Sequence, residues 1–141
     1  MTEEELHEIS GRVTRIQTLV RQIRQSDMVA YAGATWDWHL MHYDTEYVKR
    51  LGFPAPIVDG QVLGALMAEC LQDWLGPKAQ LTRLAFRFKA PVFAGQIVSC
   101  GGNTVPSTDG IIHSELAVQV VDADGLVTAV AAQGSAEARI R

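Results

Sequence analysis

Residues 60–76, GQVLGALMAECLQDWLG, form the stretch that decides the fold. Asp59 precedes it as a helix N-cap, and Gly76 followed by Pro77 ends it. Apolar side chains occupy nearly the whole circumference of this helix, which is typical of a helix buried in the centre of a domain. We therefore expect one long buried helix over residues 60–75.

Downstream of this helix, apolar residues recur with a period of two. They share one face in residues 82–90, TRLAFRFKA, and again in residues 111–120, IIHSELAVQV. The pairs Asp109-Gly110 and Asp124-Gly125 predict hairpin turns, so this half should be an antiparallel meander with one apolar face. The long helix is the only large apolar element that could cover that face. The sequence thus predicts an α+β chain, a single hot-dog domain in which a curved antiparallel sheet wraps around one buried helix.

The first half of the chain supplies shorter elements. Residues 1–12 form a polar segment that fits a helix or a disordered tail, and residues 13–141 form the hot-dog domain. A loose alternation over residues 13–25 predicts a strand. Ser26 predicts the start of one short helix, and Asp44 that of another.

Composition excludes several classes of protein. The chain has 141 residues, a hydrophobic fraction of 48% and a net charge of −4, which is typical of one globular domain without the basic face of a nucleic-acid binder. No apolar run approaches the ~20 residues of a membrane span, and the acidic start is unlike a secretory signal, so we expect a cytoplasmic protein. Cys70 and Cys100 are isolated, with no spacing of a redox or zinc motif.

The predicted fold also has consequences for assembly. Its sheet leaves an open edge, and one copy covers the central helix poorly. We therefore expect a homodimer or a higher homo-oligomer.

Residues 35–44, TWDWHLMHYD, carry the first candidate chemistry. Asp37 and His42 lie five residues apart on a segment without periodicity, so their side chains could converge on one point. A carboxylate and an imidazole placed in this way can share the proton transfers of adding or removing water. The alternative is that Asp37 caps a local turn and His42 is a structural turn histidine. Asp37, His39 and His42 could also ligate a metal ion, but no distant ligand supports them, and we expect none.

Two further features could bind a substrate. At the start of the long helix, Gly60 lets a ligand approach the backbone, and its N–H could stabilise a carbonyl oxygen that becomes an enolate. The alternative is that Asp59 is only a cap and Gly60 only permissive. Arg83, Arg87 and Lys89 form a basic row that could bind the phosphates of a carrier such as coenzyme A, or be a solvated strand face.

Residues 31–67, from YAGATWDWHLMH to GFPAPIVDGQVLGALM, resemble the signature of MaoC-like (R)-specific enoyl-CoA hydratases and dehydratases. Residues 86–98, FRFKAPVFAGQIV, resemble the first long strand and turn of the same family. The resemblance implies that Asp37 and His42 are the catalytic pair and that the Gly60 N–H holds the thioester carbonyl.

The sequence departs from the family pattern at four positions. His39 replaces an asparagine, Leu40 a proline, Trp36 a glycine, and Asp59 the histidine before the long helix. His39 and Asp59 are therefore candidate substrate-positioning residues. Some members of the family pair an active chain with a degenerate one, so a heteromer with a related chain is an alternative to the homodimer.

The resemblance implies a hydro-lyase that adds water to, or removes it from, the C2=C3 bond of a 2-enoyl-CoA thioester, with no cofactor and no metal. Coenzyme A would enter only as part of the acyl-CoA substrate. Two alternatives remain. One is a hot-dog thioesterase, for which Glu69 and Asp73 are the candidate carboxylates on the central helix. The other is a non-catalytic partner subunit of a heteromeric hydratase.

Overall fold

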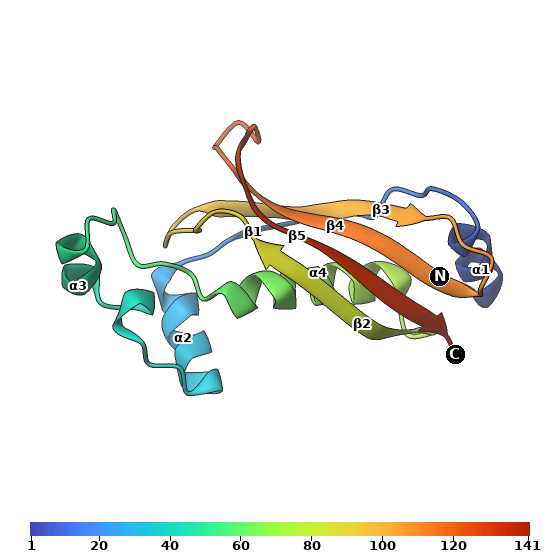
Figure 1. The fold of residues 1–141 in the computed structure, drawn as a ribbon, viewed down its shortest axis with the longest axis horizontal. Helices are drawn as coiled ribbons and strands as arrows, with labels where there is room; N and C mark the ends of the chain where they lie inside the picture. Colours follow the sequence, from blue (N-terminus) through green and yellow to red (C-terminus); the bar gives the residue numbers. More distant parts are fainter.

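A computed structural model describes residues 1–141, and one curved sheet dominates it (Figure 1). The sheet is antiparallel throughout, with strand order β1-β3-β4-β5-β2. Its strands are β1 Leu19–Gln22, β2 Ala79–Phe88, β3 Ile97–Val105, β4 Ile111–Val121 and β5 Val127–Ile140. The helices are α1 Glu3–Ser10, α2 Gln25–Thr35, α3 Thr45–Arg50 and α4 Gly60–Leu75, with a 3-10 turn, η1, at Leu40–His42. Helix α4 lies along the sheet, which is the predicted hot-dog arrangement.

Helix α4 begins and ends as its sequence predicts. The Asp59 carboxylate accepts a hydrogen bond of 2.9 Å from the Gln61 N–H, and Gly76 ends the helix with a φ of 77°. One face packs into the core through Leu63, Gly64, Leu66, Met67, Cys70, Leu71 and Leu75. The opposite face is accessible, and Ala65 on it is exposed. The helix is therefore buried on one side only, although its apolar residues encircle it.

The strands of the second half alternate as expected. The apolar face predicted for β4 is buried, namely Ile112, Leu116, Val118 and Val120. The prediction of a simple meander is correct only for β3, β4 and β5. Strand β2 pairs with β5 at the far edge, because α4 crosses the sheet before the chain re-enters it.

The N-terminal segment is a helix and belongs to the core. Thr2 caps α1 through a reciprocal pair of hydrogen bonds with Glu5. Leu6 and Ile9 are 0% and 4% exposed, so the polar segment contributes to the same core as the rest of the domain. The strand predicted over residues 13–25 is shorter and consists of β1 with one isolated bridge before it.

A small helical lobe, made of α2, η1 and α3, extends beyond one end of the sheet (Figure 1). Asp44 caps α3 as predicted, accepting a bond of 2.9 Å from the Tyr47 N–H. The prediction that Ser26 starts α2 is wrong. The N-cap is Arg24, two residues before the predicted cap, because the Asp27 carboxylate accepts a hydrogen bond of 2.9 Å from the Arg24 N–H. No helix in this fold is both long enough and apolar enough to cross a bilayer.

Candidate active site

Asp37 follows directly on the end of α2. The helix ends at Thr35 and is followed by the C-cap residue Trp36, whose φ of 60° makes it the one non-glycine residue with positive φ. A left-handed conformation costs a non-glycine residue about 1–2 kcal/mol, which explains why glycine suits this position in the family pattern. The conformation redirects the chain at the helix end, immediately before Asp37.

His42 is oriented by a backbone carbonyl. It ends η1, and its Nδ1 lies 2.7 Å from the Ile57 carbonyl oxygen. Since a carbonyl oxygen only accepts hydrogen bonds, Nδ1 carries the proton, and the neutral ring presents the lone pair of Nε2. The side chain is 12% exposed, so packing also restricts the ring. The structure thus holds His42 in the tautomer that a general base requires.

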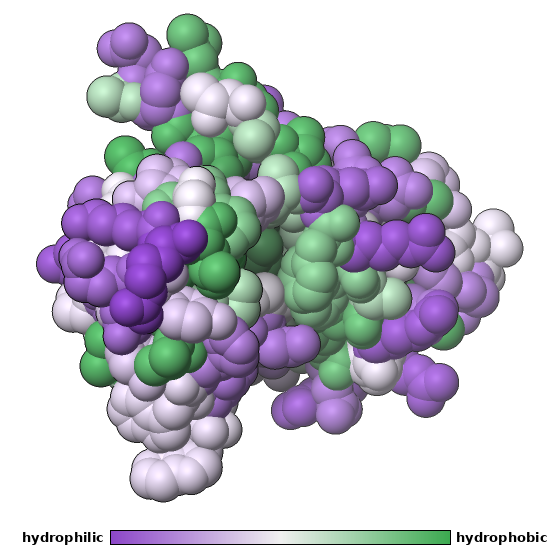
Figure 2. All heavy atoms as spheres, turned by 60° about the vertical axis from the view of Figure 1, so that its left-hand side comes forward, coloured by the Kyte–Doolittle hydropathy of each residue, from purple (hydrophilic) through white to green (hydrophobic).

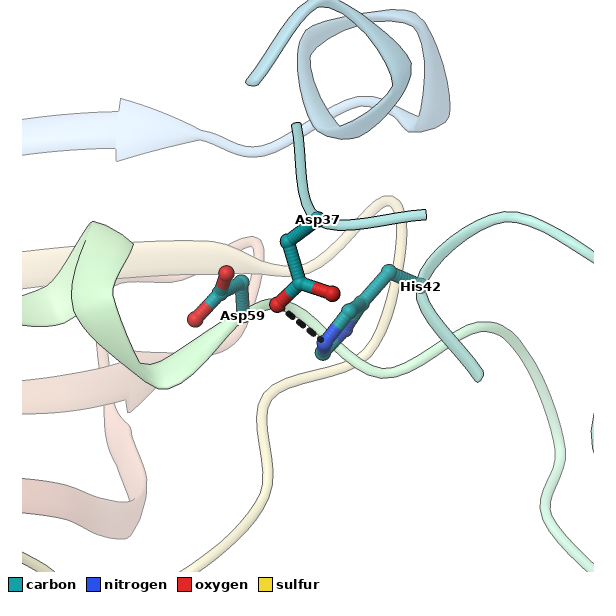
Figure 3. Close-up of side chains that lie close together, drawn as sticks. All are labelled: Asp37, His42 and Asp59. Atoms are coloured by element: carbon teal, nitrogen blue, oxygen red, sulfur yellow. Dashed lines mark ion pairs between the residues drawn. The ribbon is translucent and has the colours of Figure 1, made fainter. Parts of the chain in front are cut away.

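The lone pair of Nε2 is on the side of Asp37 (Figure 3). The two side chains are 3.9 Å apart, measured from Nε2 of His42 to Oδ2 of Asp37. The other Asp37 oxygen, Oδ1, accepts a bond of 3.2 Å from the His39 N–H, which fixes the carboxylate. A separation of 3.9 Å is too long for a direct hydrogen bond. The hollow that the two side chains line has no room for a water molecule, so a water that bonds to both groups has to approach from the exposed side of Asp37.

Asp59 is the third polar side chain of this cluster (Figure 3). Asp37, His42 and Asp59 each offer one ligand atom, and these atoms all lie within 4.8 Å of one another. Tyr31 borders the cluster, and its pKa is raised by burial and, to a smaller extent, by the charge of Asp59. Met28 lies beside Tyr31 and makes part of the surrounding wall apolar. The cluster therefore holds two carboxylates, one imidazole and an apolar margin.

The His39 side chain is not part of the cluster. Its Nδ1 accepts a bond of 3.2 Å from the Met41 N–H and so caps η1. A metal ion would therefore find Asp37, His42 and Asp59 as its ligands, rather than the set with His39 considered from the sequence. That no metal is bound stays a prediction.

Gly60 is the first residue of α4, next to Asp59. Its N–H makes no hydrogen bond within the chain, because the first bonds of the helix come from Gln61 and Val62. A Cβ at this position would lie 2.3 Å from the Phe88 ring, so any other residue here would displace that ring. The structure thus leaves one helix-terminal donor unused beside the cluster.

The predicted basic row, Arg83 and Arg87 on β2 and Lys89 directly after it, lies outside this cluster. Arg83 is bound by Glu137 at 3.1 Å, whereas Arg87 and Lys89 are exposed without an ion-pair partner. The structure therefore reduces the predicted row to two cations.

Exposed apolar side chains gather at the end of the molecule that carries the cluster. Figure 2 shows this end, with apolar patches and polar groups around a hollow between two bulges. The exposed residues of the lobe and of the nearby end of β2 include Trp36, which is 80% exposed, and Trp38, Leu40, Leu51, Phe53 and Phe88. Such a surface is typical of an interface or a ligand-binding region.

The sequence profile of the MaoC like domain family matches residues 9–122. The chain belongs to this family. Two curated relatives align with part of this MaoC-like domain. They are a mitochondrial 3-hydroxyacyl-[acyl-carrier-protein] dehydratase of Arabidopsis thaliana, 25% identical over 89 residues, and an (R)-specific enoyl-CoA hydratase of Rhodospirillum rubrum, 29% identical over 83 residues. The alignments cover 61% and 58% of this chain, but only 53% and 58% of the relatives. The domain thus spans little more than half the length of the curated relatives it matches.

Solved structures support the fold of this MaoC-like domain. The ChsH1-ChsH2 complex from Mycobacterium tuberculosis contains a chain with a TM-score of 0.81 and 21% identity, with coverage of 94% of this chain and 98% of that one. An (R)-hydratase from A. caviae involved in PHA biosynthesis has a TM-score of 0.75 and 23% identity, with coverage of 94% and 96%. Both have the hot-dog arrangement described above.

Sequence reasoning missed two parts of the site in this MaoC-like domain. The Ile57 carbonyl, which orients His42, carries no signal, because any residue supplies a carbonyl. Tyr31 and Met28, on the helix before the cluster, could have been found from their spacing of three, which places them on one helix face.

Proposed function

We propose that this chain is a hydro-lyase that adds water to, or removes it from, the C2=C3 bond of a 2-enoyl thioester, with an acyl-CoA as substrate. The observation that carries the proposal is the gap of 3.9 Å between Asp37 and His42, in which the free Nε2 lone pair faces the carboxylate. The unused Gly60 N–H beside it supplies a donor for the thioester oxygen. The two curated relatives, a dehydratase and a hydratase, support this reaction class.

In the hydration direction, one water molecule bonds to Asp37 and to Nε2 of His42. The water oxygen bonds to C3, and at the same time Nε2 of His42 takes a proton from the water. The electrons of the C2=C3 bond move toward the thioester carbonyl, and the Gly60 N–H stabilises the charge on its oxygen. The pair then returns the proton to C2, so that one water is added with no net change in protons. The dehydration direction reverses these steps.

This chemistry requires no cofactor and no metal, because every charge that develops has a counterpart among the residues named above. For assembly, we propose a homodimer or a heteromer with a related MaoC-like chain. The exposed apolar end supports a partner of this kind, as does the similarity to a chain of the ChsH1-ChsH2 complex. Sedimentation at micromolar concentrations tests it, and a monomer at all concentrations would contradict it.

The purified protein is assayed with crotonyl-CoA and longer enoyl-CoA thioesters, following absorbance of the enoyl group and release of free thiol. Loss of absorbance without thiol supports the hydro-lyase. Asp37→Asn and His42→Ala should each reduce the rate by about 10²–10⁴-fold, and the double variant should be scarcely slower than either. Circular dichroism and thermal unfolding confirm that each variant folds. A loss below tenfold in both single variants contradicts the assigned roles.

The same assay separates the two alternatives. Release of thiol would indicate a thioesterase, although both Glu69 oxygens are bound by Arg21, at 2.6 and 3.1 Å, which disfavours Glu69 as its reactive carboxylate. No reaction with any thioester would indicate a non-catalytic partner subunit.

A further inference from the structure

A groove of about 540 Å³ lies between β1, α2 and α4. Its apolar floor is formed by Met28 and Tyr31 from α2 and by Val62, Ala65 and Leu66 from α4. Pockets with mostly apolar walls and few polar groups are the usual binding sites for small molecules. No step of the proposed reaction, as described above, uses this groove.

The groove is continuous with the candidate active site. Met28, Tyr31 and Val62 line both the groove and the small hollow that contains Asp37 and His42. A substrate whose reactive carbons lie against those two side chains can therefore extend past Met28, Tyr31 and Val62 into the groove.

The other side of α4 is closed to such a substrate. A Cβ on Gly64 would lie 2.4 Å from the Phe86 ring, and one on Gly60 would lie 2.3 Å from the Phe88 ring. The two rings also contact each other, with centroids 5.5 Å apart. Aromatic side chains thus fill the space between α4 and β2, and the groove beside α2 is the open direction.

An ion pair crosses the far end of the groove. Arg21 donates to both oxygens of Glu69, with distances of 3.1 Å from Nη1 and 2.6 Å from Nη2. The bidentate bond with Glu69 raises the pKa of Arg21. Glu69 lies seven positions after Val62 on α4, which corresponds to about 10 Å along the helix axis. The groove is therefore apolar beside Met28, Tyr31 and Val62, and charged where Arg21 and Glu69 line it, with a second ion pair, Arg24–Asp27, on its wall.

We propose that this groove binds the acyl chain of the substrate and that the Arg21–Glu69 ion pair limits the length of chain that it accepts. A chain within the apolar part buries each methylene against α2 and α4. A longer chain would bring its end against the pair and remove water from two charges without replacing their hydrogen bonds. The inference rests on the proposed function, because the acyl chain is placed by the reacting carbons.

The test measures kcat/KM for crotonyl-, hexenoyl-, octenoyl-, decenoyl- and dodecenoyl-CoA. In the unmodified protein, kcat/KM should rise by up to about fourfold per methylene, which corresponds to ~0.8 kcal/mol each, and then stop rising. Ala65→Phe, which fills the groove, should lower kcat/KM for the long chains and leave crotonyl-CoA unchanged. Gln72→Phe introduces the same ring on the exposed face of α4 outside the groove and is the matched control.

The double variant Arg21→Leu/Glu69→Leu removes both charges and should extend the rise in kcat/KM to longer chains. An unchanged chain-length profile in this variant overturns the role of the ion pair. Equal losses for crotonyl-CoA and the long chains in Ala65→Phe overturn the groove as the acyl site. Calorimetry with saturated acyl-CoA thioesters measures chain-length dependence of binding without turnover. Absence of hydration with retained chain-length-dependent binding therefore refutes the proposed reaction and leaves the groove supported.

Discussion

Gly60 and Phe88 provide a direct test of how the start of α4 is built. Replacement of Gly60 by alanine keeps the backbone N–H and adds only a Cβ, which would lie 2.3 to 3.0 Å from three atoms of the Phe88 ring. Real Cβ atoms do not tolerate such contacts, so the ring has to move. Phe88 is 57% exposed and can turn toward solvent without disturbing the core.

The magnitude follows from that exposure. Full burial of a phenylalanine stabilises a protein by about 1.5–3 kcal/mol, and somewhat less than half of the Phe88 surface is covered, so Gly60→Ala should cost about 1 kcal/mol. Phe88→Ala alone should cost a similar amount. The double variant Gly60→Ala/Phe88→Ala should cost no more than Phe88→Ala, because the clash has been removed. Gly33→Ala is the control, since its Cβ would be 3.7 Å from the nearest atom and it lies inside α2.

Urea unfolding of the four proteins of this cycle, with Gly33→Ala beside them, gives the free energies of unfolding. Gly33→Ala should be neutral or more stable by up to about 1 kcal/mol, as alanine favours helix over glycine. The hydration rate of Gly60→Ala should fall by less than the ~10²–10³-fold that loss of an oxyanion donor costs, because the N–H remains. Additive losses of about 2 kcal/mol in the double variant would show that Phe88 and Gly60 do not interact as described.

Three other predictions concern single sites. Elemental analysis should find no stoichiometric metal, and a chelator should leave the hydration rate unchanged. If about one zinc or iron is found per chain and a chelator removes both the metal and the activity, Asp37, His42 and Asp59 are instead metal ligands. The His39→Asn variant should retain hydratase activity, because asparagine can also cap η1. If His39→Asn is inactive and Asp37→Asn is active, the acid–base pair is misassigned. Hydrogen bonds from Ser107 and His113 lower the pKa of Asp109 to about 2, so Asp109→Asn should lower Tm at neutral pH. The difference in Tm between the variant and the unmodified protein should shrink as the pH falls from 3.8 toward 2, because the carboxylate then becomes protonated. A difference in Tm that does not change with pH would contradict this linkage.

Local signals were sufficient for the elements that build the core. The start of α4 could be predicted because Asp59 caps it, and its end because Gly76 adopts a positive φ that glycine favours. The buried face of β4 follows from alternation alone, since successive side chains of a strand point to opposite faces. These features depend on residues a few positions apart, which is the range that a sequence pattern describes.

Long-range placement could not be predicted in the same way. The position of β2 beside β5 depends on where α4 leaves the sheet, and no residue near β2 encodes that crossing. The helical state of residues 3–10 depends on the packing of Leu6 into the core, which no pattern within this segment encodes. Likewise, Asp37 and His42 were found from their spacing, whereas the carbonyl of Ile57, which sets the tautomer of His42, lies fifteen residues away.

Asp59 shows why a departure from the family pattern can leave this fold intact and still change its site. Aspartate is among the best N-cap residues, so it stabilises the start of α4 fully. Its Oδ1 accepts a hydrogen bond from the Gln61 N–H. The same carboxylate stands within 4.8 Å of ligand atoms of Asp37 and His42, where it adds a second negative charge and contributes to the raised pKa of Tyr31. A substitution at a helix start can thus satisfy the backbone equally well while altering the electrostatics that a bound thioester would meet.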